Sequence, residues 1–189
     1  MKKKTLYTIS AILFIVGMAL IFLVATGTLQ RCSSDGNPRD KAAAVIDAFE
    51  KSHDPLGIDY ARNRASADTI IGYYNEFANN YPDDSLAPAC LHKAANISCL
   101  IGDFDNAVVY AKKVVDGYVG YEAMDDCILT LAKSYELGER PDDAKAAYQL
   151  FIDTYPDHPL TEDLKRTIQL LDMGAVTPEE QLAAILADK

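Results

Sequence analysis

Apolar residues recur along most of the chain at intervals of three and four positions, the spacing of a helix that buries one face. Within residues 87–101 the apolar positions are Cys90, Leu91, Ala94, Ala95 and Leu100. Gly102 interrupts this pattern, and Asp103 or Asp105 can cap a second helix that reaches about Val115. The same order returns at 122–137 and 142–154, which predicts two successive helical hairpins.

The pattern repeats with a period of 37 residues. Phe77 and Phe151 stand 74 positions apart, as do Tyr81 and Tyr155, and Tyr118 lies halfway between the two tyrosines. Further sets at this spacing are Ile70, Ala107 and Ala144; Tyr74, Ala111 and Tyr148; Cys90 and Cys127; and Ala95 and Ala132. A period of about 20–50 residues is typical of arrays in which each hairpin packs against the next.

Glycine and proline mark the turns between these helices. Gly102 and Gly138 are offset from the period by one position, which we ascribe to the turn. Tyr81-Pro82 and Tyr155-Pro156 end helices, because proline cannot continue a helix. The residues that can cap the following helices are Asp84, Ser85 and Asp157.

The fold class predicted is all-α. We expect residues 41–189 to form one domain of about three hairpins, near 50–82, 86–119 and 123–156. Helices at 160–173 and 178–187 should cap the end of the array. A short amphipathic helix at 40–51 should precede the hairpins, with Ala44, Val45, Ala48 and Phe49 on its apolar side. After a turn at 54–57, a long helix should run through Asn80.

Side-chain size predicts how the hairpins pack. Small residues inside each hairpin should let its two helices approach closely, at Ala95, Ala107, Ala132 and Ala144. Bulky residues should fill the gap to the following hairpin, at Tyr74, Phe77, Tyr148 and Phe151. Cys90 and Cys127 should be buried as small hydrophobic side chains, with a disulfide between them as the alternative.

The first 30 residues differ from the rest. Three lysines, at positions 2–4, precede an uncharged stretch of 24 residues at 6–29, long enough as a helix to cross a bilayer core about 30 Å thick. We expect a retained membrane anchor. The alternatives are a cleaved signal peptide and a lipoprotein signal cut before Cys32, which would then carry the lipid. By the positive-inside rule the N-terminus stays cytoplasmic, and the domain, joined by a polar linker at 31–40, faces the periplasm or exterior.

Charge argues against one class of partner. All 28 acidic residues lie beyond position 30, where 15 basic residues oppose them, so this part of the chain carries a net charge of −13. Such a surface repels phosphate backbones, and no basic stripe is present to overcome that repulsion. We therefore expect no nucleic-acid partner.

The sequence carries no recognisable catalytic constellation. It contains no G-x-S-x-G, P-loop or H-E-x-x-H motif. His53, His92 and His158 have no partner at metal-ligand spacing, and we expect them at the surface. Three aspartate pairs, at 83–84, 125–126 and 142–143, stand near helix starts, where capping and the helix dipole explain them. We therefore expect no enzymatic activity, cofactor or metal.

The order of these residues resembles the tetratricopeptide repeat. The matching positions are Ala95, Gly102 and Ala107, then Ala132, Gly138, Ala144, Tyr148, Phe151 and Pro156. The period of 37 exceeds the usual one of about 34, and Val119 replaces proline in the middle hairpin. Residues 81–94 and 143–163 are similar to the bacterial envelope proteins YbgF/CpoB and BamD. The layout, one N-terminal anchor and a small exported repeat domain, resembles YfgM, an accessory subunit of the secretion translocon.

This resemblance, over about residues 66–165, implies a right-handed superhelix whose inner face is lined by the first helix of each hairpin. The groove residues it implies are Ala89, His92, Asn96, Cys99, Asp126, Leu129, Lys133 and Glu136, with a solvated helix face as the alternative. The function implied is a non-enzymatic scaffold or adaptor that binds protein or peptide partners of the envelope, as an accessory factor of secretion or envelope assembly. The alternative is an outer-membrane lipoprotein of BamD or YbgF/CpoB type, acting in outer-membrane assembly or constriction. Oligomeric state stays open.

Overall fold

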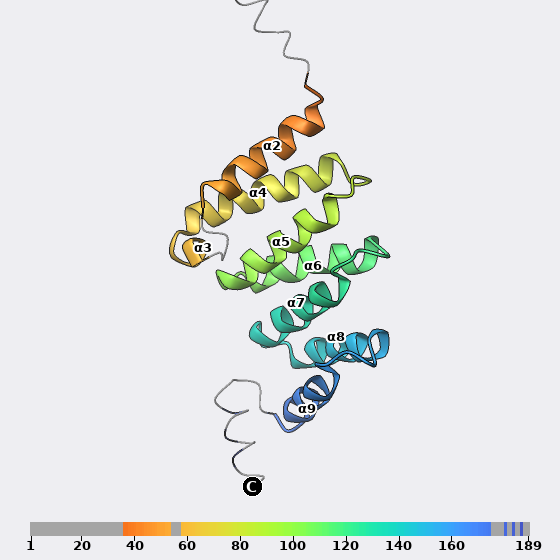
Figure 1. Cartoon of the computed structure of the whole chain (residues 1–189). Coiled ribbons are helices and arrows are strands. Elements are labelled where there is room, and N and C mark those ends of the chain that lie inside the picture. The colour runs from red at the N-terminus through yellow and green to blue at the C-terminus, as the bar shows by residue number, and fades with distance from the viewer. Residues whose placement is uncertain (1–35, 54–57, 175–179, 181–182, 184–185, 187–189) are drawn as a thin grey trace, which may run out of the picture. The chain divides into compact units, whose positions relative to one another are not determined.

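The structure is a computed structural model that describes residues 36–53, 58–174, 180, 183 and 186. The regular elements in these residues are all helices (Figure 1), which confirms the all-α prediction for this part of the chain. They are α2 (Pro38–Lys51), α3 (Ile58–Arg62), α4 (Arg64–Asn80), α5 (Ala87–Leu100), α6 (Phe104–Gly117), α7 (Met124–Leu137), α8 (Pro141–Thr154) and α9 (Thr161–Asp172).

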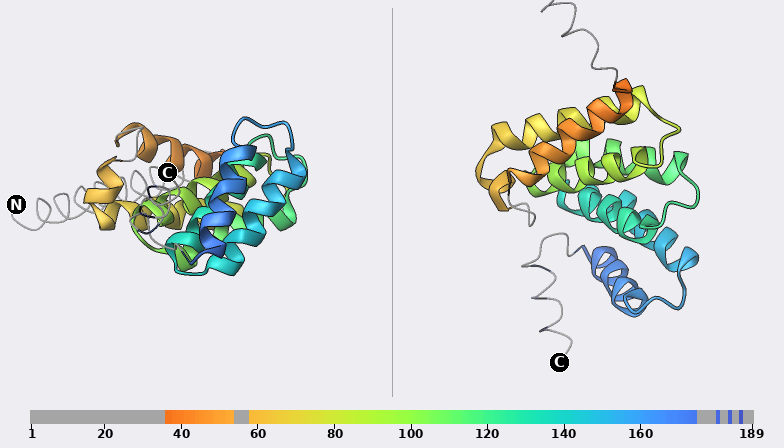
Figure 2. Two further views of the ribbon diagram at one scale, coloured as in Figure 1. Left: turned by 90° about the horizontal axis from the view of Figure 1, so that it is seen from below. Right: turned by 45° about the horizontal axis from the view of Figure 1, so that its top comes forward.

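Two compact units make up the chain, residues 1–41 and 42–189, and the hairpins lie in the second. Within that unit the helices from α4 to α9 each contact the next in chain order. α5 also contacts α7, so the first helices of successive hairpins lie side by side (Figure 1, Figure 2). The buried side chains form two clusters, one from α2 to α5 and one from α4 to α9. Helix α5 contributes to both, as expected when each hairpin packs against its neighbours.

The three tyrosines of the repeat hold the same place in three loops. Tyr81, Tyr118 and Tyr155 end α4, α6 and α8 with φ of −133°, −123° and −127° and ψ of 59°, 66° and 63°. In each loop the residue three positions later donates its backbone N–H to the tyrosine carbonyl, at 3.0, 3.1 and 3.1 Å. These loops lie along one edge of the stack, on the right in Figure 1. The recurring tyrosine therefore marks a structural repeat.

The interpretation that Gly102 matches Gly138, with the turn absorbing an offset of one position, is wrong. The turn after α5 places Gly102 at φ 76°, and the turn after α7 places Glu139 at φ 57°, so the period of 37 is kept and Gly102 matches Glu139. Gly138 has a different role. A Cβ atom there would lie 2.9 Å from the Ser134 carbonyl oxygen and 3.3 Å from the Phe104 Cβ, so glycine is needed where α7 ends against α6.

Side-chain size acts as predicted in the core. The four alanines at 95, 107, 132 and 144 are fully buried. Phe77 and Phe151 are 1% and 0% exposed, and the equivalent Tyr74 and Tyr148 are both 3% exposed. Because these four large side chains are buried in the two core clusters, they supply much of the apolar burial that holds the stack together.

Three local expectations need correction. The long helix expected through Asn80 is interrupted at Asn63, whose side chain accepts a hydrogen bond from the Ser66 N–H at 3.2 Å and caps the start of α4. Helix α2 begins at Pro38, inside the expected linker, because proline is well suited to the first turn of a helix. The apolar side of α2 is also rotated from the one predicted: Ala44, Val45 and Ala48 are exposed, and Ile46 is buried against the next helices.

The expected caps form only in part. Asp103 caps α6 by accepting from the Asn106 N–H at 3.3 Å, as predicted. Asp84 accepts instead from the Leu86 N–H at 2.9 Å, one residue before α5, and α5 and α9 begin without a side-chain cap. Hydrogen-bonded turns lead directly into both helices, so the first residues of α5 and α9 are already aligned.

The N-terminal predictions concern residues that the structure does not describe. The stretch at 6–29 and Cys32 lie outside the described residues, as does most of the helix expected at 178–187, in which Glu180, Ala183 and Leu186 are helical. Of the helices that are described, none is both long and apolar enough to cross a membrane.

Candidate protein-binding groove

A hollow of about 350 Å³ lies between α5 and α7, the first helices of two successive hairpins. Its lining residues are Asn96, Cys99 and Leu100 from α5 and Leu129, Thr130 and Lys133 from α7. Four of these six belong to the eight groove residues predicted from sequence. Asn96 and Lys133 hold the same position in their hairpins, 37 residues apart, so the repeat itself places their polar ends on one face. We call these six residues the groove.

The groove joins an apolar part to a polar one. Leu100 is 50% exposed and Leu129 is half-buried, so the two leucines offer apolar surface. The Thr130 hydroxyl lies 2.7 Å from Asn96 Oδ1 and so links α7 to α5 across the floor. Such a combination suits a peptide that buries one apolar side chain and hydrogen-bonds beside it.

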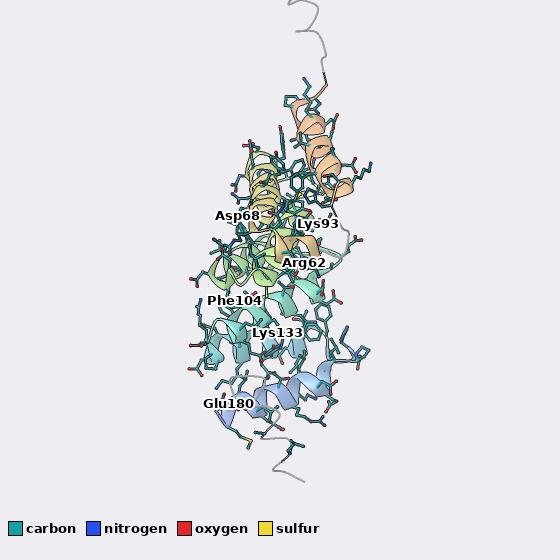
Figure 3. All side chains as sticks on the ribbon, turned by 90° about the vertical axis from the view of Figure 1, so that its left-hand side faces the viewer. Arg62, Asp68, Lys93, Phe104, Lys133 and Glu180 are labelled. Carbon is teal, nitrogen blue, oxygen red and sulfur yellow. The ribbon has the colours of Figure 1, made fainter. Side chains whose placement is uncertain are left out.

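Lys133 is positioned by a buried carboxylate. Its ammonium donates to Glu136 Oε2 at 3.2 Å, while the Tyr148 hydroxyl donates to the same oxygen at 2.5 Å. Burial, and then the hydrogen bond to Glu136, raise the pKa of Tyr148, so this phenol stays protonated and remains a donor. The Lys133 side chain is still 55% exposed, which leaves ammonium surface for a partner. Figure 3 labels Lys133 among the side chains of this part of the stack.

The other four predicted residues do not line the groove. His92 and Glu136 are only 5% and 4% exposed, so their side chains belong to the packed interior and offer no open surface. Ala89 lies toward the start of α5 and lines a different hollow, and Asp126 is exposed in the first turn of α7. The spacing selected one residue per turn, and it missed Leu100 and Thr130, which stand beside Cys99 and Leu129. A wider helical stripe would have included both.

His92 corrects the expectation of surface histidines. Its Nδ1 lies 3.2 Å from the Tyr121 hydroxyl, and its Nε2, which has no hydrogen-bond partner, lies 3.5 Å from Asp126 Oδ2. Burial lowers the pKa of His92, and the nearby Asp126 and Asp125 oppose that effect. The ring therefore favours the neutral form. His53 and His158 are half-buried, and His53 stacks on Phe49 with 4.2 Å between the rings.

The buried thiol of Cys127 is unreactive and unpaired with Cys90. Cys127 carries a free thiol, so the alternative disulfide to Cys90 is not formed. Its sulfur lies 3.7 Å from the Ala111 carbonyl oxygen, and burial, with a smaller effect of Asp126, raises its pKa to about 12. A thiol of that pKa stays protonated and is a poor nucleophile. In the described part of the chain, no group of three His, Cys, Asp or Glu side chains is placed to hold a metal ion.

Comparison with known proteins supports the repeat. The sequence profile of the tetratricopeptide repeat family matches residues 126–158, which span nearly all of α7, all of α8 and the start of the loop that follows. The chain matches none of the curated proteins with which it was compared. Repeats of this family typically serve as non-catalytic modules that bind protein partners. The hairpin of α7 and α8 is therefore a tetratricopeptide repeat, set in an all-helical stack.

Proposed function

We propose that this protein is a non-enzymatic scaffold of the bacterial envelope that binds a protein partner through the groove between α5 and α7. The observation that carries the proposal is the hollow of about 350 Å³ between the first helices of successive hairpins, lined by Leu100, Leu129 and Lys133 among others. A tetratricopeptide repeat suggests a protein-binding helical scaffold. Since the groove combines exposed apolar surface with a positioned ammonium, it can bury a side chain of the partner and fix its orientation at once.

The place in the envelope rests on the sequence alone. Residues 2–4 are lysines and residues 6–29 carry no charge, the pattern of a single N-terminal pass with a cytoplasmic N-terminus. This layout is similar to that of YfgM, which supports a role as an accessory factor of secretion or envelope assembly. The alternative of a BamD or YbgF/CpoB type lipoprotein rests on Cys32, and it would place the same groove on a lipid anchor.

The chain offers a matched pair of residues for a test of the groove. Leu100 and Leu137 hold the same repeat position, 37 residues apart, and are 50% and 40% exposed, yet only Leu100 lines the groove. Lys133→Ala is a poorer probe, because it also removes a partner of the buried Glu136 carboxylate.

We would place a photo-crosslinking phenylalanine analogue at Asn96 of the full chain in bacterial membranes. We expect a protein partner to be crosslinked at this position. The crosslinked product should be lost in the Leu100→Glu variant and retained in the Leu137→Glu variant. Equal loss in both variants, or no specific product, would contradict the groove. N-terminal sequencing and palmitate labelling decide the anchor: a retained N-terminus supports the single pass, and label that disappears with Cys32→Ser supports the lipoprotein.

A further inference from the structure

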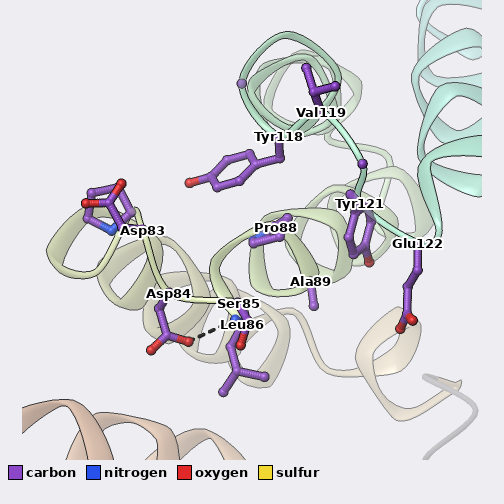
Figure 4. Close-up of a pocket in the computed structure, with 13 residues that line it drawn as sticks. Asp83, Asp84, Ser85, Leu86, Pro88, Ala89, Tyr118, Val119, Tyr121 and Glu122 are labelled. Atoms are coloured by element: carbon purple, nitrogen blue, oxygen red, sulfur yellow. Dashed lines mark hydrogen bonds between the residues drawn. The ribbon is translucent and has the colours of Figure 1, made fainter.

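A second hollow, of about 1070 Å³, opens between the loops that follow α4 and α6, which begin at Tyr81 and Tyr118. Its lining residues are 82–86, Pro88, Ala89 and 117–122 (Figure 4). It shares no residue with the groove, and it lies on the edge of the stack where those loops are, on the right in Figure 1. We call it the loop hollow. Because the groove and the loop hollow are separate surfaces, a partner in one leaves the other open.

The loop hollow is acidic and partly apolar. Asp83, Asp84 and Glu122 line it, and no lysine or arginine is among the lining residues. Val119 is 97% exposed beside them. In Figure 4 the Tyr118 phenol points across the hollow towards Asp83, and Asp83 adds to the effect of burial in raising the pKa of Tyr118. The hollow thus pairs exposed apolar surface with negative charge.

Val119 departs from the repeat without a structural need. The equivalent residues in the first and third loops are Pro82 and Pro156, and the backbone of Tyr118 matches that of the other two loop tyrosines. Turn geometry therefore does not require valine here. A fully exposed valine side chain gains little from folding, and its apolar surface is open to a contact outside the stack.

In the next pair of loops an acidic side chain has a histidine of the same chain beside it. There, His158 Nε2 from the third loop lies 4.0 Å from Asp125 Oδ2 at the start of α7. Asp83 and Glu122 are exposed and, in the part of the chain that the structure describes, neither forms an ion pair. Their charge is left for a ligand, and anionic ligands such as nucleic acid or acidic lipid headgroups are repelled.

We propose that the loop hollow is a second protein-docking site, which takes a basic segment of a partner with a small apolar side chain. The apolar side chain packs on Val119, and lysine or arginine side chains pair with Asp83 and Glu122. Charge complementarity decides the occupant, because Asp83 and Glu122, with no lysine or arginine among the residues that line the hollow, favour a cationic segment.

A defined peptide pair tests this with the full chain in neutral detergent micelles. The probe is fluorescein-labelled Lys-Gly-Val-Lys-Arg-Gly, and its acidic counterpart is Glu-Gly-Val-Glu-Glu-Gly, both followed by anisotropy against empty micelles. The double variant Asp83→Asn/Glu122→Gln should weaken binding of the basic probe by about 2- to 30-fold, the range for two exposed ion pairs. Val119→Ser should weaken it as well.

Matched controls separate docking from diffuse attraction to an acidic protein. Asp157 is the equivalent of Asp83 in the third loop, and Glu162 is exposed on α9, so Asp157→Asn/Glu162→Gln removes the same charge elsewhere. Val109 is exposed on α6 and serves as the control for Val119. Both control variants should bind as the unmodified chain does. Equal weakening by the paired variants, equal binding of the acidic peptide, or no binding of the basic probe would each overturn the proposal.

Discussion

Gly102 and Glu139 hold the same left-handed backbone conformation at the same point of two successive hairpins, with φ of 76° and 57°. In both turns the following residue donates its N–H to a carbonyl five positions earlier, at 2.8 and 2.9 Å. A residue with a Cβ atom disfavours this conformation by about 1–2 kcal/mol, a cost that glycine avoids. The turn between α7 and α8 is therefore strained where the turn between α5 and α6 is relaxed.

This strain predicts opposite effects of two substitutions. Glu139→Gly should raise the free energy of unfolding by about 0.5–1 kcal/mol, since relief of strain exceeds the extra freedom of glycine in the unfolded chain. Gly102→Ala should lower it by about 1 kcal/mol. Urea unfolding of the full chain, followed by circular dichroism, measures both. Gly117→Ala is the control, because no atom lies within 4 Å of its Cβ position and its φ is not positive. A less stable Glu139→Gly variant would contradict the strain.

Two equivalent tyrosines provide a second comparison. Tyr148 donates to Glu136 and Tyr74 to Glu50, each at 2.5 Å, but the glutamate side chains are 4% and 33% exposed. Removing the donor from a buried carboxylate costs more than removing it from one that water reaches. Tyr148→Phe should therefore cost about 1–3 kcal/mol of stability and Tyr74→Phe about 0.5–1 kcal/mol. The urea midpoints of the two variants measure the two losses of stability. A larger loss of stability for Tyr74→Phe would refute this account of Glu136.

Phe151 tests whether the hairpins act as an array. Its side chain is fully buried where α8 packs in the core, so Phe151→Ala should lower the free energy of unfolding by about 3–5 kcal/mol through lost burial and a cavity. Since each hairpin is stabilised by its neighbours, amide hydrogen exchange should accelerate first in α8 and α9 while α4 stays protected. Leu150→Ala, at an adjacent position that is 41% exposed, is the control with little expected change. Uniform acceleration from α4 to α9 would indicate one cooperative core.

His92 makes stability depend on pH. Because burial lowers its pKa in the folded state below the ordinary value of about 6.5, the unfolded chain takes up the proton first as pH falls. The stability due to neutral His92 is complete above about pH 6.5 and is lost as pH falls through the lower folded pKa. Asp125 and Asp126 face the ring and limit the loss.

A variant without the titrating ring isolates this effect from that of the carboxylates. The urea midpoint of the unmodified chain should fall more between pH 7.5 and pH 5 than that of His92→Gln. Parallel pH profiles of the two proteins would show that the buried histidine does not contribute.

The amino-acid sequence by itself determined the repeat and most of its packing. A period of 37 residues, the alanines at 95, 107, 132 and 144, and the large residues at 74, 77, 148 and 151 are local regularities. A stack of hairpins requires small residues where helices meet and large ones where hairpins meet, so these positions can be assigned before any contact is known. The recurring tyrosine is another such regularity, since its backbone has nearly the same φ and ψ in all three loops.

Only the tertiary structure decided which polar residues are buried. His92 and Glu136 follow the spacing of a solvent-facing stripe, yet Tyr121 and Tyr148, which lie 29 and 12 positions away in the chain, meet them in the packed interior. The break at Asn63 has a local cause instead: the apolar pattern runs through it, but its side chain caps α4. Helical periodicity shows which residues share one face of a helix, but it does not show which neighbouring element packs on that face. In a stack where α5 contacts α4, α6 and α7, a polar side chain becomes core or groove according to the neighbour it meets.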